Sequence, residues 1–402
     1  MNKDKTRVLM LAHVFPRALD DSMGAFLLHL ADALAEQGAR IDVIAPHAVN
    51  LADGESFGAI RVWRFHYAPT HWEQLAYAGT MHEFVARGIV NKILFAFFNI
   101  AFFFKAIFVV HAASAQLLHA HWWLPGGLVG ALVSLITHVP LVITTHGTDV
   151  EILRRTRWAK PLARFVFARA RAITCGSTYM REQLLALGVA DAAQVSVIPM
   201  PVSAEFGIQN SEPRIQNSQV LTVARLTKQK STDTLIDALA ILRERGSDAR
   251  LKIIGDGPER SALERHACDL CLQDRVEFVG ALPQKDLPSQ YAVCAIFVLP
   301  SVREGMGLVL AEALLCGAPV IAVNSGGVTD IVRDGETGLL FPERDARALA
   351  DAIEKLLNDR ALAVRLATNG ATWVRERFTR EHVAAQFSGI YSRTRIHADE
   401  RG

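Results

Sequence analysis

Residues 300–330 read PSVREGMGLVLAEALLCGAPVIAVNSGGVTD and decide the fold. They follow an apolar run typical of a buried strand, 295–299, and begin with a tight glycine-containing loop, 303–307. Apolar residues at helical spacing then predict a helix over 308–315, a Gly-Ala-Pro sequence ends it, and 320–323 predicts another strand. A strand, a glycine turn and a helix start bring backbone N–H groups and the positive end of a helix dipole together. This element therefore predicts a site for a negatively charged ligand.

Two carboxylates lie in this element, Glu304 in the loop and Glu312 in the predicted helix. At about 1.5 Å of rise per residue, their spacing separates the two backbone positions by up to about 12 Å. A sugar joined to a phosphate has about this length, so one acid could hold the sugar and the other the far end of the ligand. We therefore formulate the hypothesis of a nucleotide-sugar site, which the rest of the chain must support.

The length, composition and net charge of the chain limit the classes of protein to which it can belong. A chain of 402 residues is long for a single core, so two domains are expected. Half of the residues are hydrophobic and 21% are charged, which indicates a globular protein. The net charge is only +2, whereas a dedicated nucleic-acid binder is expected to be strongly basic. We therefore expect no nucleic-acid partner.

The cysteines indicate a reducing compartment. There are five, an odd number without the spacing of a disulfide framework, and the first apolar run has strand length rather than signal-peptide length. We therefore expect a cytoplasmic protein. Cys268 and Cys271 have a CxxC spacing, but they lie in a helical pattern without a second such pair. This context favours packing in the core over a metal or redox site.

The N-terminal half predicts a parallel sheet. A strand over 7–12, a loop, a helix over 25–36 and a strand over 40–45 follow one another, and ligands bind such sheets at the carboxyl ends of the strands. Gly24 stands where the helix begins, so a phosphate could approach its backbone, although a helix-entry turn explains this glycine equally well. Four further strands are predicted at 116–120, 141–145, 172–177 and 195–199.

Residues 89–110, IVNKILFAFFNIAFFFKAIFVV, form the most apolar segment. Its length approaches the roughly 20 residues of a membrane span. Lys92, Asn99 and Lys105 interrupt it, and a lysine near the middle of a span costs about 2.5 kcal/mol or more. Three interpretations stay open: a helix buried in the domain, a helix in a membrane surface, and a true span.

Polar and basic residues follow the strand at 141–145. Its end leads into Thr-His-Gly-Thr-Asp at 145–149, where His146 could stabilise a positively charged sugar, bond a hydroxyl, or serve only the structure. His119 and His121 lack a carboxylate partner at ligand spacing, so no metal site is predicted. The basic helical pattern over 151–172 is either a solvated face or a surface for anionic lipid or a pyrophosphate-linked acceptor.

The chain changes character at 201–219, which reads as a linker between domains, before the strand–helix alternation restarts. We therefore predict an N-terminal domain over 1–200 and a C-terminal domain over 220–379. A last helix over 380–395 could cross back to the first domain. Two such domains in tandem leave a cleft, which is a preferred place for a ligand.

Three loops of the C-terminal domain follow strands. Arg225 and Lys230 place cations directly after a predicted strand, as a diphosphate clamp requires. Glycine turns at 255–258 and 324–327 follow two further strands. No two aspartates show the i, i+2 spacing of a metal–diphosphate motif, so we predict phosphate binding by Arg225, Lys230 and helix N-termini, without a metal.

With these residues in view, the chain resembles the retaining glycosyltransferases of family 4, over most of its length. The most specific part is EGMGLVLAEALLCGAPVIA at 304–322, followed by SGGVTDIV and DGETGLL. The cations after a strand and the HGTD sequence at 146–149 agree with it. The resemblance implies the α/β fold called GT-B, in which two Rossmann-like parallel-sheet domains face each other across a cleft.

The resemblance also implies roles for the matching residues. Glu304, with the backbone of Gly305, Met306, Gly307 and Leu308, would hold the donor sugar and its phosphate. Glu312 would bind the nucleotide ribose, and Arg225 and Lys230 would neutralise the diphosphate. Gly24 would lie close to that diphosphate, and His146 near the reacting carbon. The resemblance further implies that no metal or other cofactor is needed and that the departing phosphate takes the acceptor's proton.

Two positions depart from the family's pattern. The family often has a glycine pair in the first loop, whereas this chain has Met23-Gly24-Ala25, and Ser231 follows Lys230 where glycine is common. The family includes members that bind membranes peripherally, which adds weight to the surface interpretation of 89–110 and makes an anionic membrane a candidate partner.

We therefore expect a cytoplasmic, membrane-associated hexosyltransferase that moves a sugar from a nucleotide donor to a glycan or lipid-linked acceptor in surface-polysaccharide or glycolipid assembly. The alternatives are a GT-B epimerase or phosphorylase, and a noncatalytic subunit that binds a sugar nucleotide.

Overall fold

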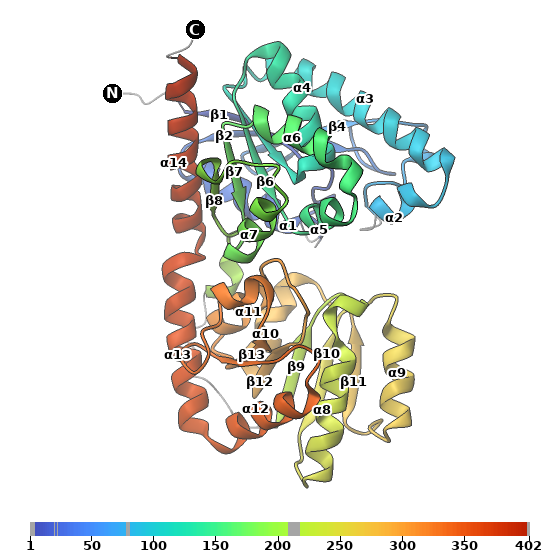
Figure 1. Ribbon diagram of the computed structural model, residues 1–402, viewed down its shortest axis with the longest axis vertical. Coiled ribbons are helices and arrows are strands. Elements are labelled where there is room, and N and C mark those ends of the chain that lie inside the picture. The colour runs from blue at the N-terminus through green and yellow to red at the C-terminus, as the bar shows by residue number, and fades with distance from the viewer. Residues whose placement is uncertain (1–4, 20, 22, 78–80, 208–217, 400–402) are drawn as a thin grey trace. The chain divides into compact units, whose positions relative to one another are not determined.

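The computed structural model describes residues 5–19, 21, 23–77, 81–207 and 218–399 (Figure 1). The chain forms two compact units. Unit 1 comprises Met1–Pro201 together with Arg380–Gly402, and unit 2 comprises Val202–Thr379. Each unit is built around one sheet, with helices packed on it. The chain therefore leaves unit 1 once and returns to it with its last helix.

Unit 1 contains an eight-stranded sheet with the order β3-β4-β2-β1-β5-β6-β7-β8. The strands are parallel except that β3 pairs antiparallel with β4. Central strands such as β1 and β5 are buried, because a parallel sheet is covered on both faces, and they therefore read as apolar runs. The bounds are β1 (Arg7–Leu11), β2 (Arg40–Pro46), β3 (Gly54–Phe57), β4 (Ile60–Phe65), β5 (Leu117–His121), β6 (Leu141–Thr145), β7 (Ala172–Cys175) and β8 (Val195–Val197).

The helices of unit 1 connect these strands and cover the sheet. The long helix α3 inserts Phe98 and Phe102 into the core beside Phe65 of β4, with the rings of Phe65 and Phe102 stacked 4.8 Å apart. Helix α4 packs against both α3 and α6. The bounds are α1 (Ala25–Glu36), α2 (Met81–Ala86), α3 (Ile89–Ala112), α4 (Leu128–Thr137), α5 (Thr148–Arg155), α6 (Lys160–Arg169) and α7 (Thr178–Ala186).

The last helix, α14 (Arg380–Asp399), belongs to unit 1. It packs along α1, and Arg380 bonds the carboxylate of Glu36 at 2.8 Å. The hydroxyl of Tyr391 lies 2.7 Å from Nδ1 of His119, which is a buried residue of β5. Residues 272 positions apart in the sequence therefore share one polar contact inside unit 1.

Unit 2 contains a six-stranded sheet with the order β11-β10-β9-β12-β13-β14, in which every pairing is parallel. Apolar clusters pack on the sheet, one with α8 and α12 and another with α10 and α11. The strands are β9 (Gln219–Val223), β10 (Arg250–Ile254), β11 (Val276–Gly280), β12 (Ile296–Leu299), β13 (Val320–Val323) and β14 (Leu339–Phe341). The helices are α8 (Thr232–Glu244), α9 (Arg260–Asp269), α10 (Leu287–Val293), α11 (Leu308–Leu315), α12 (Ala346–Asn358) and α13 (Arg360–Arg377).

The parallel sheets confirm the predicted α/β class, and most strands lie within a residue or two of their predicted positions. Several expectations were wrong in detail. The basic pattern over 151–172 is two helices, α5 and α6, separated by the turn Arg157–Ala159. Pro161 explains this break, because proline lacks the N–H that a continuous helix needs and suits a helix start instead. The strands β3 and β4 were not predicted.

Two further expectations change. Most of the predicted linker, 208–217, lies outside the described residues, but the turn Ala204–Gly207 belongs to unit 2, where Phe206 is buried in the core. Cys268 and Cys271 were expected in the core, yet both are exposed. They stand at the end of α9, where Cys271 has a positive φ of 51° and the chain turns away from the helix.

Candidate functional site

The candidate site of unit 2 lies at the carboxyl ends of three neighbouring strands, β9, β12 and β13. The loop after β9 contains Lys230, the loop after β12 contains Glu304, and the loop after β13 contains residues 325–327. The carboxyl edge of a parallel sheet is where ligands bind in folds of this class. The loops that the sequence singled out thus stand together in the structure.

Glu304 joins these three loops. Its carboxylate pairs with the ammonium group of Lys230. Its backbone oxygen accepts a hydrogen bond from the N–H of Gly327 at 2.7 Å. Next to it, the N–H of Arg303 donates to Oγ of Ser325 at 3.2 Å. The position of the Glu304 carboxylate is therefore set by contacts from both neighbouring loops.

Gly326 is required at this junction by two constraints. Its φ of 73° is in the left-handed region, which side-chain-bearing residues rarely adopt. A Cβ at this position would also lie 2.5 Å from the backbone oxygen of Glu304. The close approach of the loop after β13 to the loop after β12 thus depends on the missing side chain.

The ion pair keeps Glu304 ionised. Burial alone would raise the pKa of this carboxyl group. The charge of Lys230 and its hydrogen bond, together with a hydrogen bond from the N–H of Gly305, outweigh burial and hold the pKa below its ordinary value. Glu304 is therefore an anion that can accept hydrogen bonds from hydroxyl groups at neutral pH.

The residues after Glu304 lead directly into a helix start. Gly305, Met306 and Gly307 form the connection, and α11 begins at Leu308. Gly307 has a φ of 80°, and its carbonyl accepts a hydrogen bond from the N–H of Leu310 at 2.9 Å. The first N–H groups of a helix have no partner inside it, and the helix dipole is positive there. This turn therefore offers backbone donors to an anion.

Glu312 lies in a different environment from Glu304. It is only 8% exposed on α11, and the hydroxyl of Tyr291 donates to its Oε2 at 3.1 Å. Burial raises the pKa of Glu312 to about 7, with the Tyr291 hydrogen bond acting in the opposite direction. A carboxyl group with this pKa is partly protonated at neutral pH, so it can both donate and accept hydrogen bonds.

Arg225 is exposed in the loop after β9, on the same loop as Lys230. This loop is held by its neighbour after β10, since the N–H of Leu226 donates to the backbone oxygen of Asp256 at 2.9 Å. A Cβ at Gly255 would lie 1.9 Å from the oxygen of Ala224, so this approach again needs a glycine. The structure brings Lys230 to Glu304 and leaves Arg225 on the surface of the loop.

Unit 1 has a polar cluster of its own at the carboxyl ends of β1, β5 and β6. His146, directly after β6, has Nε2 3.0 Å from Nδ1 of His121. The ring of Trp122 lies 4.3 Å from that of His146 and 4.2 Å from that of His13. Among the described residues, Nε2 of His121 and Nδ1 of His13 have no hydrogen-bond partner. Three imidazoles and an indole therefore share one partly buried surface.

Burial keeps these histidines neutral. It lowers the pKa of His146 and His119 to about 3 and that of His13 to about 4, and it lowers the pKa of His121 well below its ordinary value. A neutral imidazole does not repel a positive charge that develops nearby. His119, which the sequence raised with His121 as a metal ligand, instead contacts Thr144 and Tyr391, each at 2.7 Å.

Gly24 lies at the same edge, after β1, and its carbonyl accepts the N–H of Leu27 at the start of α1. Its φ is 79°. The structure thus places Gly24 and His146 in unit 1, and Arg225, Lys230, Glu304 and Glu312 in unit 2.

Two positioning residues were missed in the sequence. Asp149 is buried and accepts hydrogen bonds from the N–H groups of His146 and Trp123, both at 3.0 Å, so it fixes the turn that carries His146. The sequence signal for it is its place in the first turn of α5, where an acidic side chain is favourable. Tyr291 is distant from Glu312 in the chain, and nothing in the local sequence predicts their contact.

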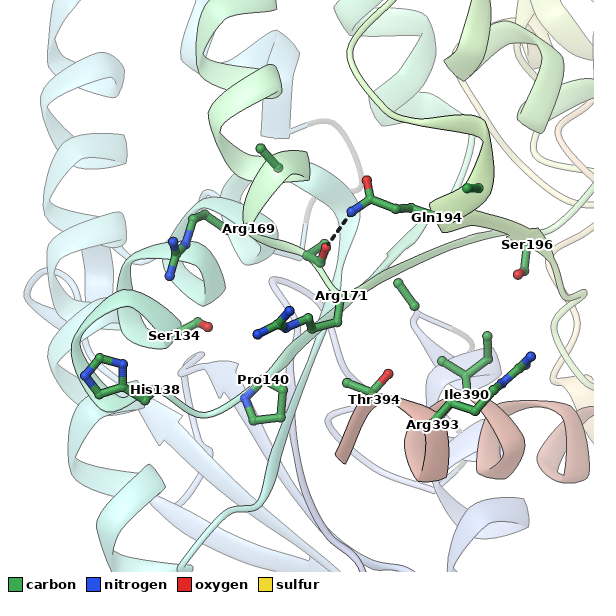
Figure 2. Close-up of a pocket in the computed structure, with 14 residues that line it drawn as sticks. Ser134, His138, Pro140, Arg169, Arg171, Gln194, Ser196, Ile390, Arg393 and Thr394 are labelled. Carbon is green, nitrogen blue, oxygen red and sulfur yellow. Dashed lines mark hydrogen bonds between the residues drawn. The ribbon is translucent and has the colours of Figure 1, made fainter. Parts of the chain in front are cut away.

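A hollow of about 870 Å³ also lies in unit 1, but at the opposite end of the sheet (Figure 2). Pro140, Arg171 and Gln194 line it, immediately before β6, β7 and β8 respectively. The side chains of Arg171 and Arg393 point in opposite directions, so they do not converge on one anion (Figure 2). We therefore do not assign the candidate site to this hollow.

Comparisons with known proteins cover nearly the whole chain. The family model described as "Glycosyl transferases group 1" matches residues 206–373. A second model, "Glycosyl transferase 4-like domain", matches residues 22–201. The two matches correspond closely to unit 2 and to the first segment of unit 1.

Individual relatives agree with the family models. The chain is 31% identical over 269 residues to the GDP-mannose-dependent alpha-(1-6)-phosphatidylinositol monomannoside mannosyltransferase of Mycobacterium tuberculosis, covering 62% of this chain and 68% of that one. Sucrose-phosphate synthase from Thermosynechococcus elongatus has a similar structure, with a TM-score of 0.80 and 25% identity over 97% of this chain and 99% of that one. Anabaena HepE, solved with UDP and glucose, has a TM-score of 0.73 and 22% identity over 96% and 99%.

Replacing Gly326 by alanine should destabilise unit 2 more than the same change at Gly335. Both glycines have a positive φ, 73° and 71°, so each alanine costs about 1–2 kcal/mol of backbone strain. Only at Gly326 does the new Cβ meet another loop, because nothing lies within 4 Å of it at Gly335. We expect roughly 1–3 kcal/mol of additional loss for Gly326→Ala. Urea unfolding measures both, and equal losses would contradict the packing argument.

Glu312→Gln should reduce the dependence of stability on pH. The pKa of Glu312 is about 7 in the folded chain against an ordinary value of 4.5, so the folded state binds more protons between these values. Stability therefore falls as pH rises through this window, by on the order of 3 kcal/mol from this group. Glutamine does not titrate. The free energy of unfolding is measured at pH 4.5 and pH 8 for the unaltered protein and for the variant. The same difference between the two pH values in both proteins would refute the prediction.

Proposed function

The chain belongs to the glycosyl transferases group 1 and is a glycosyltransferase with the GT-B fold, and from this premise we propose its reaction. It transfers a hexose from a nucleotide-diphosphate sugar to a glycan or lipid-linked acceptor, with retention of the α-configuration and without a metal or other cofactor. The product would serve surface-polysaccharide or glycolipid assembly.

The observation that carries this proposal is the junction of three loops around Glu304 in unit 2. It combines an ionised carboxylate, the ammonium of Lys230 and the N-terminus of α11 at one sheet edge. A nucleotide sugar needs acceptors for its sugar hydroxyls and positive groups for its diphosphate. Glu304 supplies the first, while Lys230, Arg225 and the backbone from Gly305 to Leu308 supply the second.

Lys230 lies between the group proposed to bind the sugar, Glu304, and the proposed diphosphate position. Its ammonium already neutralises Glu304, so a diphosphate that binds beside it shares the same cation. Glu304 would then turn its carboxylate oxygens toward the sugar hydroxyls. Glu312, with its hydroxyl partner Tyr291, would bind the hydroxyls of the ribose as an acid that can donate as well as accept.

The chemical step would take place on one face of the sugar. The bond from the anomeric carbon to the diphosphate oxygen breaks, the bond to the acceptor oxygen forms, and the acceptor's proton passes to the departing phosphate. Arg225 and Lys230 stabilise the negative charge that grows on the leaving group. We propose that His146, as a neutral imidazole, bonds the sugar and tolerates its developing positive charge, and that Gly24 lies near the diphosphate.

A thermal-shift screen of UDP-, GDP- and ADP-sugars tests the donor class, because a ligand that binds the folded state raises its apparent stability. The expected result is a clear shift with one nucleotide, followed by transfer to an added acceptor. Free sugar released without an acceptor would indicate an epimerase instead, and a requirement for inorganic phosphate a phosphorylase. If Glu304→Gln left cellular glycan synthesis unchanged despite normal donor binding, the chain would be a noncatalytic subunit.

Arg225→Ala and Lys230→Ala should each lower kcat/KM by on the order of 100-fold, or about 2.7 kcal/mol of transition-state stabilisation. Lys228→Ala is the matched control, since Lys228 is exposed on the same loop, and we expect a change below about twofold. Arg225→Ala is the cleaner of the two, because Lys230→Ala also leaves Glu304 without its cation. A loss below about twofold in both variants would remove the clamp assignment.

We further propose that the protein is cytoplasmic and binds the inner face of the membrane through helices α3, α4 and α6. Large apolar side chains stand exposed on the outer side of these neighbouring helices. They are Ile89, Val90, Ile93, Phe97, Ile100, Phe104 and Phe108 on α3, Leu132, Leu135 and Ile136 on α4, and Leu162 and Phe165 on α6. An apolar surface of this extent marks an interaction site.

The charges on the same helices favour an anionic lipid surface as the partner. None of the three helices contains an aspartate or glutamate, whereas Lys92, Lys105, Lys160, Arg164 and Arg169 are spread along them. Apolar insertion together with cations is the combination that binds anionic bilayers. By length and composition α3 could cross a membrane, but its inner face, with Phe98 and Phe102, packs in the core of unit 1. We therefore propose surface binding.

The double variant Phe97→Asp/Phe104→Asp should lose most of its binding to anionic vesicles, by about tenfold or more, because two exposed aromatic rings no longer enter the bilayer. Flotation with vesicles of phosphatidylcholine, with and without phosphatidylglycerol, measures this. Val49→Asp is the control, since Val49 is also exposed in unit 1 but lies outside the three helices. Absence of salt-sensitive binding by the unaltered protein would overturn the proposal.

A further inference from the structure

A cluster of ionisable side chains, separate from the residues discussed so far, lies in unit 1 at the carboxyl ends of β2 and β4. His47 follows β2 and His66 follows β4, on the side of β1 away from β5 and β6. Because Pro46 and Phe65 are partners in the β2–β4 register, the two histidines that follow them stand side by side, with ring centroids 3.9 Å apart. The turn Thr70–Trp72 brings Glu73 to the same place.

Both imidazole rings contact the carboxylate of Glu73, one ring at each oxygen. Nδ1 of His47 lies 2.6 Å from Oε2 of Glu73, and Nδ1 of His66 lies 3.2 Å from Oε1. Ligand atoms of the three residues all fall within 4.8 Å of one another. Within the described parts of the chain, no other group of three or more His, Cys, Asp or Glu residues meets this criterion.

The outer atoms of the two rings are held by acceptors. Nε2 of His47 lies 2.9 Å from the backbone oxygen of Leu51, and Nε2 of His66 lies 3.0 Å from Oδ1 of Asp53. Neither oxygen can donate, so Nε2 is the donor in each contact, and Nδ1 of each ring is left facing the carboxylate of Glu73. The carboxylate of Glu73 has only lone pairs to offer in return. A metal ion between them would accept a lone pair from each of the three groups.

We propose that His47, His66 and Glu73 bind a divalent first-row transition-metal ion, with Zn²⁺ the best fit. Two imidazoles and a carboxylate suit this ion, and a second hydrogen bond from each ligating ring to a carbonyl or carboxylate is the usual arrangement around it. Ligands about 2.0–2.2 Å from a tetrahedral ion lie roughly 3.3 Å apart. The contact between His66 and Glu73 has this spacing, and that between His47 and Glu73 would widen by about 0.7 Å.

The three side chains leave one position of a four-coordinate ion open. His47 and Glu73 are buried, whereas the side chain of His66 is 43% exposed, which provides a route for the ion and room for a water ligand. Glu73 is further oriented by the N–H of Tyr67, which donates to Oε1 at 3.0 Å. The ion would join the segment after β2 to the segment after β4. This inference does not depend on the proposed glycosyl transfer.

The test is metal binding by the full chain, without a histidine tag. The protein is dialysed against a chelator and then against metal-free buffer, and Zn²⁺ is titrated in a calorimeter. We expect one tight equivalent, released protons and a raised melting temperature. Co²⁺ in place of Zn²⁺ should give the visible absorption of a tetrahedral site. Absence of a stoichiometric equivalent would overturn the proposal.

Three variants identify the site. His66→Ala should weaken binding by roughly tenfold or more, whereas His71→Ala, which removes an exposed histidine from the same segment, should leave it within about twofold. Asp53→Asn keeps all three ligands and removes only the negative charge that Nε2 of His66 contacts, so we expect roughly tenfold weaker binding. This variant tests the site even if His66→Ala does not fold. Circular dichroism checks the fold of each. Equal affinity in all three variants would place the ion elsewhere and refute the assignment.

Discussion

The ion pair between Lys230 and Glu304 is the constraint on which the candidate donor site depends. Their side chains are only 22% and 17% exposed, so neither charge is fully hydrated and each needs the other. A pair of this kind adds little to the free energy of unfolding, because the loss of hydration offsets the attraction. Its effect is positional. It sets where the loop after β9 meets the loop after β12, and the loop after β13 then packs against the backbone of Glu304.

The same two physical effects, burial and neighbouring charge, determine the protonation states throughout the candidate sites. Glu304 and Glu312 lie only eight positions apart, yet the first has a lowered pKa beside a cation and the second a raised pKa in an apolar setting beside Tyr291. In unit 1, burial without a counter-charge keeps His146 and its neighbours neutral. The local surroundings thus give an ionised Glu304, a Glu312 whose pKa is about 7, and several neutral imidazoles.

The sequence predicted the α/β class and most elements, because central strands of parallel sheets are continuous apolar runs. It failed where the local pattern is weak: β3 is the edge strand and β4 is next to it, and polar residues interrupt the apolar pattern of both. Glu304 and Lys230 could be singled out as strand-end residues, but their contact spans 74 positions and depends on the strand order. The contacts of Tyr291 with Glu312 and of Tyr391 with His119 were likewise not predicted, since tertiary packing alone brings these residues together.

The composition of residues 89–110 does not determine whether this helix is buried, lies in a membrane surface or spans a membrane. Mean hydropathy could not separate a buried helix from a surface helix, because both need many apolar residues. The structure gives α3 an inner face in the core and an outer apolar face that also extends over α4 and α6. The exposed face, rather than the total apolar content, is what distinguishes this helix from an ordinary core helix.

The return of α14 to unit 1 has a consequence for how the chain is made. Unit 2 is continuous in sequence and is complete once Thr379 has left the ribosome, whereas unit 1 must wait for the last helix. Until then α1 lacks its packing partner, and the buried His119 lacks the hydroxyl of Tyr391. Unit 1 is therefore begun first but completed last. A message cut short near its 3′ end would yield a complete unit 2 attached to an incomplete unit 1.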